Sequence, residues 1–274
     1  MKIIIPSYKR EVVKTLRYIP QHMNENTYVV VQERDKDTIK SLPEGINKVV
    51  LPDEVRTIGP TRQWILDNFD GVVVQMDDDL RISELVDART YNLEACTPLT
   101  LMQHLERMEE LLEYYPLIGI SERAEAHLRY RNHITEVARH SRIHMMDVSW
   151  IREIGARFDR GLYTIEDYDF ILQVLGSGTA NAVYNQLFAC DFDSNSDGGC
   201  KDIRSEIDLQ TNCEKFASLH PEGVVKIVMK KTKLPGGDWE RPDVRIGWKK
   251  AFEAGCENLR FCLLYTSPSP RDRG

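Results

Sequence analysis

The sequence lacks several patterns that would assign it to a familiar class. None of its six cysteines belongs to a C-x-x-C pair, so neither a zinc site nor a disulfide framework is indicated, and scattered thiols are typical of a reducing cytoplasm. No apolar run is long enough to span a bilayer, and the opening MKIIIPSYKR does not have the pattern of a signal peptide. The formal net charge of −7 does not indicate nucleic-acid binding by the whole chain, although a local basic patch can outweigh the total. We therefore expect a cytoplasmic protein without membrane contact.

The composition is that of an ordinary globular protein up to the last residues. With 274 residues, 42% of them hydrophobic and 29% charged, the chain has room for one large domain, and we find no repeat or linker that divides it. The end, CLLYTSPSPRDRG, differs in composition from everything before it. Residues 262–272 resemble the translation of an adapter used in sequencing libraries, so we expect residues 262–274 to be a non-native, disordered tail. A tail that comes from a sequencing adapter predicts that the sequence has a metagenomic source, in which phage genes are common.

Short valine- and isoleucine-rich runs predict an α/β fold. KIIIPSY, TYVVVQERD, KVVLP and GVVVQMD read as buried strands that do not alternate with polar residues, as expected where a sheet is covered on both faces. REVVKTLRYIPQ, PTRQWILDNF, TPLTLMQHLERMEELLEYYP and TIEDYDFILQVLGSG have helical spacing. This alternation of strands and helices indicates a mainly parallel sheet.

Three adjacent aspartates, Asp77, Asp78 and Asp79, follow the fourth expected strand. Ligands of open α/β sheets bind beyond the carboxyl ends of the strands. Two carboxylates at positions i and i+2 suit a hard divalent cation, and a diphosphate would supply the oxygen ligands that they do not. A solvated turn or a helix cap would account for the same triplet, so the triplet alone does not decide.

Five segments in order resemble glycosyltransferases of the GT-A fold, in which a D-x-D motif holds a divalent metal on the diphosphate of a nucleotide-sugar. They are IIIPSYKR, VVVQERD, GPTRQWIL, VVVQMDDDL and FDRGLYTIEDYDFILQVLGSG, and they cover about residues 1–190. The overall pattern is similar to the TET-associated glycosyltransferases of bacteriophages, which act on hydroxymethylated pyrimidines in DNA. The resemblance implies one GT-A domain over residues 1–261, with a mixed, mainly parallel, Rossmann-like sheet flanked by helices. Its nucleotide-sugar half would be residues 1–95 and its acceptor half residues 96–261.

The resemblance also implies donor-site roles for particular residues. The metal, Mn²⁺ or Mg²⁺, would lie on Asp77 and Asp79, with Asp79 the preferred direct ligand and Asp78 facing away. His220, or Asp193 or Asp197, would supply a third ligand; a lone histidine also suits a structural role. Pro6, Ser7 and Tyr8 would contact the base and ribose, and Glu33, preferred over Asp35, would contact the uridine. Arg10 would reach a phosphate, and Arg62 would lie near the diphosphate or ribose.

The acidic pair Glu166–Asp167 stands just before an expected helix. In members of the family that invert configuration, such a pair carries the general base that takes the proton of the acceptor hydroxyl. We prefer Asp167 for this role and place Glu166 second. A helix cap with favourable dipole interactions would occupy the same position and is compatible with catalysis.

The segment from residue 122 to residue 144 is basic in an otherwise acidic chain. Arginines interleaved with an aromatic residue suit a phosphate backbone with stacked bases, whereas the simpler interpretation is a solvated loop. Residues 229–233 and 247–250 would extend the positive surface. The candidate contacts to nucleic acid are Arg123, Arg129, Tyr130, Arg131, Arg139 and Arg142.

We therefore expect a metal-dependent enzyme that moves a sugar from a UDP-sugar, by preference UDP-glucose, to 5-hydroxymethylcytosine in double-stranded DNA. Two alternatives remain open at this point. One is a GT-A enzyme acting on a saccharide, lipid or protein, and the other is a nucleotidyltransferase or an inert nucleotide-binding module. The segment PSYKREVVK contains no glycine, which counts against a nucleotidyltransferase.

Overall fold

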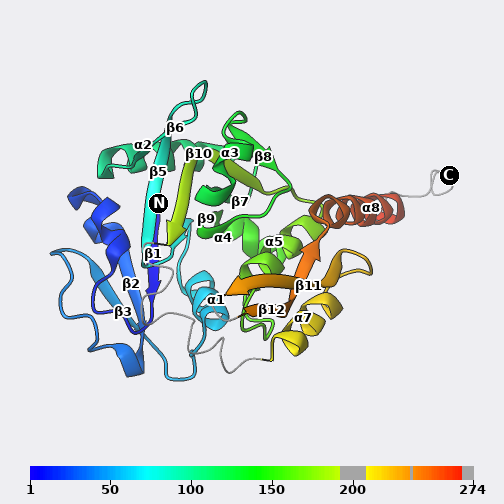
Figure 1. Cartoon of the computed structure of the whole chain (residues 1–274), viewed down its shortest axis with the longest axis horizontal. Coiled ribbons are helices and arrows are strands. Elements are labelled where there is room, and N and C mark those ends of the chain that lie inside the picture. The colour runs from blue at the N-terminus through cyan, green and yellow to red at the C-terminus, as the bar shows by residue number, and fades with distance from the viewer. Residues whose placement is uncertain (192–207, 235–236, 267–274) are drawn as a thin grey trace, which may run out of the picture.

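The computed structural model describes residues 1–191, 208–234 and 237–266, and the side chains of residues 1–191, 208–231 and 240–259. Within these residues one ten-stranded mixed sheet runs through the molecule, with helices on both of its faces (Figure 1). The strand order is β3-β2-β1-β4-β9-β7-β10-β5-β6, and β8 pairs with β10. The strands are β1 (Lys2–Ser7), β2 (Thr27–Gln32), β3 (Asn47–Leu51), β4 (Val72–Met76), β5 (Leu80–Asp87), β6 (Asn92–Ala95), β7 (Leu117–Glu122), β8 (Ile134–Glu136), β9 (Ser141–Asp147) and β10 (Ala182–Asp191).

The first four strands in this order, β3, β2, β1 and β4, are parallel to one another. β9 lies antiparallel between β4 and β7, and β10 then continues parallel to β7. The predicted α/β class with a mixed, mainly parallel, Rossmann-like sheet is therefore confirmed. Because β1, β2, β4, β7 and β10 point the same way, their carboxyl ends lie at one edge of the sheet.

Helices cover both faces of the sheet, which explains why its strands are apolar on both sides. Ile3 and Ile5 of β1 belong to one buried cluster together with Leu101, whereas Ile4 belongs to a second cluster with Ile65 and Phe170. The α-helices are α1 (Ile58–Asn68), α2 (Pro98–Leu111), α3 (Ala126–Arg129), α4 (Val148–Ile154), α5 (Glu166–Gly176), α7 (Leu209–Ser218) and α8 (Trp248–Thr266). None of the helices in the described ranges has the length and apolar character needed to cross a bilayer.

The prediction of a helix between β1 and β2 was wrong. Residues 10–21 instead hold a short 3₁₀ helix, η1 (Lys14–Tyr18), and a second one, η2 (Gln21–Asn26), follows it. Pro20 separates the two and lacks the N–H that a continuous helix would need. Thr15 and Tyr18 of η1 are buried, and their hydroxyls bond to backbone atoms of Asp77, Leu80 and Ile82.

The last part of the chain adds a two-stranded antiparallel ribbon, β11 (Val225–Leu234) and β12 (Gly237–Ile246), followed by α8. α8 lies against α5, where Gly255 allows a close approach, since a Cβ at this position would be 2.5 Å from the carbonyl oxygen of Leu175. α8 continues to Thr266, although residues 262–266 were expected to be disordered. Leucines at 263 and 264 favour a helix, which explains the difference. Residues 267–274 lie outside the described residues.

Candidate active site

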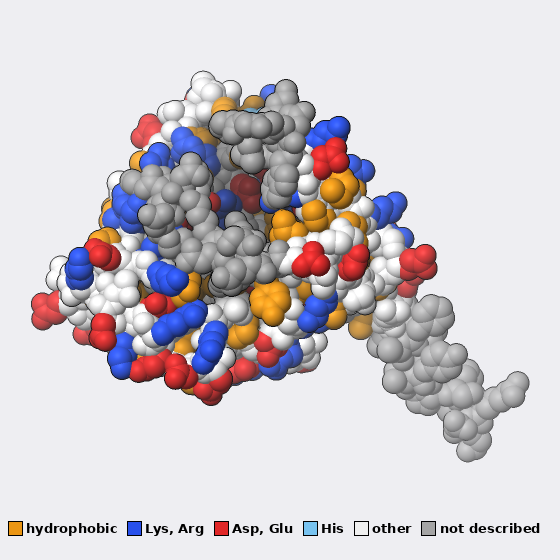
Figure 2. All heavy atoms as spheres, turned by 60° about the horizontal axis from the view of Figure 1, so that its bottom comes forward, with side chains coloured by type: hydrophobic (Ala, Val, Ile, Leu, Met, Phe, Trp, Pro, Cys, Tyr) orange, Lys and Arg blue, Asp and Glu red, His pale blue; other side chains and the backbone are white. Residues whose placement is uncertain are grey.

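A cleft of about 680 Å³ opens at the edge where the carboxyl ends of the parallel strands meet. The loop after β1, the turn after β4 and the start of α5 line it from the sheet side, and residues of α7 and of β11–β12 line it from the other side. Figure 2 looks toward this face and shows a hollow in which an acidic side chain is visible. The sequence-predicted residues that line the cleft are Pro6, Ser7, Tyr8, Arg10, Arg62, Asp77, Asp78, Asp79, Arg139, Arg142, Glu166 and Asp167.

The backbone of the aspartate triplet is fixed by contacts from two other parts of the chain. The N–H of Asp77 donates to the carbonyl of Arg142 in β9 at 2.9 Å. Thr15 makes the second contact: its N–H donates to the carbonyl of Asp78 at 3.1 Å, and its hydroxyl donates to the carbonyl of Asp77 at 2.6 Å. The triplet is thus a held turn between β4 and β5, which limits how far its carboxylates can move.

The side chains of the triplet divide differently from the expectation. Arg10 contacts two of them, since its Nη2 lies 2.7 Å from Asp79 and its Nε lies 3.6 Å from Asp78. Asp78 also accepts from the hydroxyl of Ser7 at 2.7 Å. All three aspartates line the cleft, so Asp78 does not face away as expected; Asp78 and Asp79 contact Arg10, whereas Asp77 contacts Arg62 of α1.

Burial raises the pKa of every carboxyl group in the triplet, and that of Asp78 to about 7. The positive charge of Arg10 opposes this effect at Asp78 and Asp79, and that of Arg62 opposes it at Asp77. The carboxyl groups also repel one another. Such a cluster of buried acids, where their pKa values are pushed upward, is a common property of functional sites.

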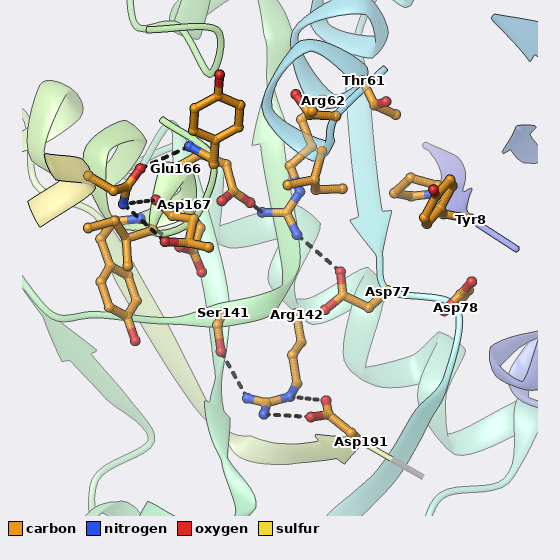
Figure 3. Close-up of a pocket in the computed structure, with 18 of the residues that line it drawn as sticks. Tyr8, Thr61, Arg62, Asp77, Asp78, Ser141, Arg142, Glu166, Asp167 and Asp191 are labelled. Atoms are coloured by element: carbon orange, nitrogen blue, oxygen red, sulfur yellow. Dashed lines mark hydrogen bonds and ion pairs between the residues drawn. The ribbon is translucent and has the colours of Figure 1, made fainter. Parts of the chain in front are cut away.

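Arg62 of α1 joins the triplet to the acidic pair on α5. Its Nη2 donates to Asp77 at 3.0 Å, and its Nη1 lies 3.3 Å from a carboxylate oxygen of Glu166. Figure 3 shows the guanidinium between these two carboxylates. Only 4% of Arg62 is exposed, so its charge is little screened by water and its orientation is fixed.

Two buried histidines lie behind Arg62. The Nε2 atom of His144 is 3.2 Å from Nη1 of Arg62, and the rings of His140 and His144 are 4.9 Å apart. Burial lowers the pKa of His140 to about 3 and that of His144 well below its ordinary value, and the charge of Arg62 lowers both further. Both rings are therefore neutral, and Nε2 of His144 accepts the hydrogen bond that Arg62 donates.

The acidic pair begins α5 on a strained backbone. Ile165, the residue just before the helix, has a φ of 63°, which is an uncommon conformation for a β-branched side chain. Glu166 is buried, whereas Asp167 is partly exposed and lines the cleft. Burial, and secondly the charge of Glu166, raises the pKa of Asp167 to about 7. A carboxyl group that titrates near neutral pH is suited to accept and release a proton.

Sequence reasoning missed Asp191, which ends β10 and lines the cleft. In the antiparallel pairing of β10 with β5, Asp191 lies opposite Leu80, the residue that follows Asp79 in the chain. Arg142 holds it through two hydrogen bonds of 2.7 and 3.3 Å, visible in Figure 3. The backbone of Arg142 has a φ of 67°, a second strained position at the cleft. An acid at the end of an apolar strand was the signal available in NAVYNQLFACD.

The carboxylates fit a divalent cation in their donor chemistry. Asp77 and Asp79 offer hard oxygen atoms, and an added positive charge would stabilise the ionised form that burial disfavours. Within the part of the chain that the structure describes, no cluster of three His, Cys, Asp or Glu side chains is arranged to hold a metal alone. A cation here would therefore take its remaining oxygen ligands from a bound diphosphate, as Mg²⁺ often does in proteins.

Two predicted residues lie away from the cleft. Glu33 faces Lys36, whose Nζ is 2.5 Å from its carboxylate, and Gln32 lines the cleft in its place because β2 ends one residue earlier. His220 is paired with Asp169 at 2.8 Å and lies in a buried contact between α5 and the end of α7. The structure thus does not bring Glu33 or His220 to the predicted donor and metal positions. Asp193 and Asp197 lie outside the described residues.

The arginines of the basic segment are largely paired with acids of the same segment. Arg139 pairs with Glu122 and Glu125, and Arg129 pairs with Glu125. Arg142 pairs with Asp191 and Glu122. These contacts reduce the charge that the segment offers to a polyanion.

The remaining residues of this set lie elsewhere on the segment. Arg123 donates to the hydroxyl of Ser83, and the ring of Tyr130 packs against that of Tyr91. Arg131 lies over the ring of Tyr130 and is exposed. Exposure of one arginine on a neighbouring aromatic ring is not by itself a nucleic-acid site.

The comparison with known proteins agrees with this arrangement. Residues 1–199 match the family model of the TET-Associated Glycosyltransferases. No curated protein matches the chain. The family match covers well over half of the sequence, including the aspartate triplet, Arg62, the acidic pair and Asp191, and the chain therefore belongs to the TET-associated glycosyltransferases and is a glycosyltransferase.

Proposed function

We propose that the protein transfers a sugar from a UDP-sugar, by preference UDP-glucose, to the hydroxymethyl group of 5-hydroxymethylcytosine in DNA, with Mn²⁺ or Mg²⁺ in the donor site. The observation that carries this proposal is one cleft that combines the aspartate triplet with an acid of pKa about 7, Asp167. The first group suits a metal-bound diphosphate and the second suits a general base. Arg62 connects the two through its contacts with Asp77 and Glu166.

In the proposed reaction the carboxylate of Asp167 takes the proton of the acceptor hydroxyl. The acceptor oxygen forms a bond to C1 of the sugar while the bond from C1 to the diphosphate oxygen breaks, and the electron pair leaves with UDP. A single displacement of this kind inverts the configuration at C1. Arg10 and Arg62, which never lose their charge at physiological pH, would stabilise the negative charge that develops on the leaving group.

Asp77 and Asp79 would hold the metal ion, which when bound supplies positive charge beside the leaving diphosphate. Pro6, Ser7 and Tyr8 would form the wall for the nucleoside. The guanidinium of Arg34 lies 4.9 Å from the centre of the Tyr8 ring, so that the ring is already held from one side. A nucleobase would pack against the rest of this wall.

Two observations bear on the identity of the acceptor. The family match favours DNA, because the chain resembles TET-associated glycosyltransferases that act on hydroxymethylated pyrimidines in DNA. The pairing of Arg139 and Arg142 with acids favours the alternative, an acceptor without a phosphate backbone such as a saccharide. One experiment separates the two.

The test supplies labelled UDP-sugars and Mn²⁺ or Mg²⁺ together with duplexes that contain either 5-hydroxymethylcytosine or cytosine. We expect label in the hydroxymethylated duplex alone, and a loss of about 100-fold or more in kcat for D167N, in line with removal of a general base. D159N is the matched control, because Asp159 pairs with Arg157 outside the cleft. Transfer to saccharides but to no DNA would establish the alternative. Failure to hydrolyse or transfer from any UDP-sugar would refute the proposed donor.

A further inference from the structure

The ribbon β11–β12 has one basic face. In a strand every second side chain points the same way, so Lys226 and Lys230 share a face with their cross-strand partners Arg245 and Arg241. The only acid between them is Asp243, which lies 3.4 Å from Lys230. Among the described residues no ion pair involves Lys226, Arg241 or Arg245. The face therefore carries four cations against a single carboxylate.

The opposite face of the ribbon packs on the protein at its Val225 end, whereas Ile227 and Met229 further along that face are exposed. Val225, Val244 and Ile246 contact the second buried cluster, the one that contains Phe216 of α7. This packing fixes the ribbon beside α7 and leaves Lys226 and Arg245 of the basic face exposed, whereas Arg241 of the same face is half-buried at the cleft. The apolar pattern alone accounts for why the ribbon folds, but it does not account for the cations.

The cations are arranged in a way that lowers the stability of the ribbon. Lys226 stands directly opposite Arg245, and Lys230 directly opposite Arg241. Like charges in directly opposite positions of a β-ladder are destabilising. The Nε atom of Arg241 is, in addition, buried without a hydrogen-bond partner. An anionic ligand on this face would offset both effects.

The ribbon is also placed to act on the acceptor. Lys230 and Arg241 line the cleft that holds Asp167, whereas Lys226 and Arg245 lie four residues further along the ribbon and outside it. Four residues span about 13 Å, which is the axial length of about four nucleotides of one DNA strand. Residues 225–246 lie beyond the family match, which ends at residue 199.

We propose that the basic face of β11–β12 binds the phosphate backbone of the acceptor DNA and so directs the modified base into the cleft. The proposal rests on the proposed function for the identity of the acceptor, and it adds where the acceptor is held. A two-stranded ribbon is narrow enough to lie along a DNA groove. The two cationic pairs would contact phosphates on either side of the nucleotide that enters the cleft.

The test is a double substitution outside the cleft, K226T/R245T. Threonine suits an exposed strand, so the ribbon should still fold, and loss of the like-charge pair should leave the melting temperature unchanged or higher. The matched control is K48T/R89T, which removes the same charge at two exposed positions, on β3 and in the loop between β5 and β6. Binding of a fluorescent duplex is measured by anisotropy over a series of salt concentrations.

We expect K226T/R245T to bind DNA about 10- to 30-fold more weakly near physiological salt, with a slope of log K against log salt that is smaller by about 1.8, as loss of two phosphate contacts predicts. Hydrolysis of the UDP-sugar without acceptor, and transfer to the free nucleoside 5-hydroxymethyldeoxycytidine, should be the same as in the wild type. The control should match the wild type in every assay.

Two outcomes separate this inference from the proposed function. If the wild type transfers sugar to DNA, and K226T/R245T does so with an unchanged KM and salt slope, the ribbon is not the docking surface. If the wild type binds DNA through the ribbon but modifies no hydroxymethylated duplex, the inference stands and the proposed acceptor chemistry fails. A wild type that does not bind DNA overturns the inference.

Discussion

The pair Glu166–Asp167 allows a prediction about pH that depends on the electrostatics of the site. Asp167 accepts a proton only in its ionised form, so kcat should fall as the pH drops through its pKa, which is about 7. The charge of Glu166 is the second cause of this raised pKa, after burial. The substitution E166Q removes the charge and keeps the size of the side chain. The acid limb of the pH profile should therefore move to lower pH.

The size of the shift follows from Coulomb's law. Two unit charges several ångströms apart interact by about 2–3 kcal/mol at an effective dielectric constant of about 20, and about 1.4 kcal/mol corresponds to one pKa unit. Water in the open cleft weakens this interaction, so we expect a shift of about one pH unit, from about 7 to about 6. In E166Q the positive charge of Arg62 is also no longer neutralised by Glu166, so it lowers the pKa of Asp167 further.

The assay is kcat at saturating donor and acceptor, measured from about pH 5 to pH 9 for the wild type, E166Q and the surface control E153Q. The control keeps the same change of charge on α4, away from the cleft. Because the pKa of Asp78 is also about 7, the D78N variant is profiled in parallel, and its acid limb should stay where it is in the wild type. An acid limb of E166Q that stays in place, or that moves to higher pH, would refute the assignment of Asp167 as the base beside a charged Glu166.

Three further results are expected. Burial raises the pKa of Asp78 to about 7, so the folded state binds the proton of this group more tightly than the unfolded state, and stability falls as the pH rises from about 4 to 7. D78N should therefore raise the free energy of unfolding in urea by about 1–3 kcal/mol at pH 8 but not at pH 4. An equal gain at both pH values would contradict this. H144L should lower kcat about tenfold because Arg62 loses the acceptor that orients it, whereas H144Q, which keeps an acceptor oxygen, should lose much less, and equal losses at equal melting temperature would count against the role. D191N should raise the Mn²⁺ concentration for half-maximal activity about tenfold, since it removes a negative charge beside Asp79, and D159N should leave that concentration unchanged; an unchanged requirement in D191N would exclude Asp191 from the metal site.

Local sequence was enough for the features that depend on neighbours in the chain. The apolar runs predicted β1, β2, β3 and β4. The same local order placed three aspartates at the end of β4 and two acids at the start of α5. Each of these predictions needs only a strand or helix period and the residue at its end.

The features that the sequence did not predict depend on contacts between distant segments. Asp191 reaches the site because β10 pairs antiparallel with β5, and no local period specifies that register. Arg139 and Arg142 look like part of a free positive patch in sequence, but the fold places Glu122, Glu125 and Asp191 beside them. Local patterns cannot foresee such neutralisation, because the partners are chosen by packing.

The sequence by itself therefore determined the class of the fold, the strand end where the site lies and the acids that distinguish it. Only the tertiary structure decided how these groups act on one another. It buried the carboxyl groups and so raised their pKa values, it set Arg62 between Asp77 and Glu166, and it brought the ribbon to the edge of the cleft. The physical reason is that charge and desolvation act through space, and distances in space are fixed by the long-range pairing of strands rather than by the order of residues.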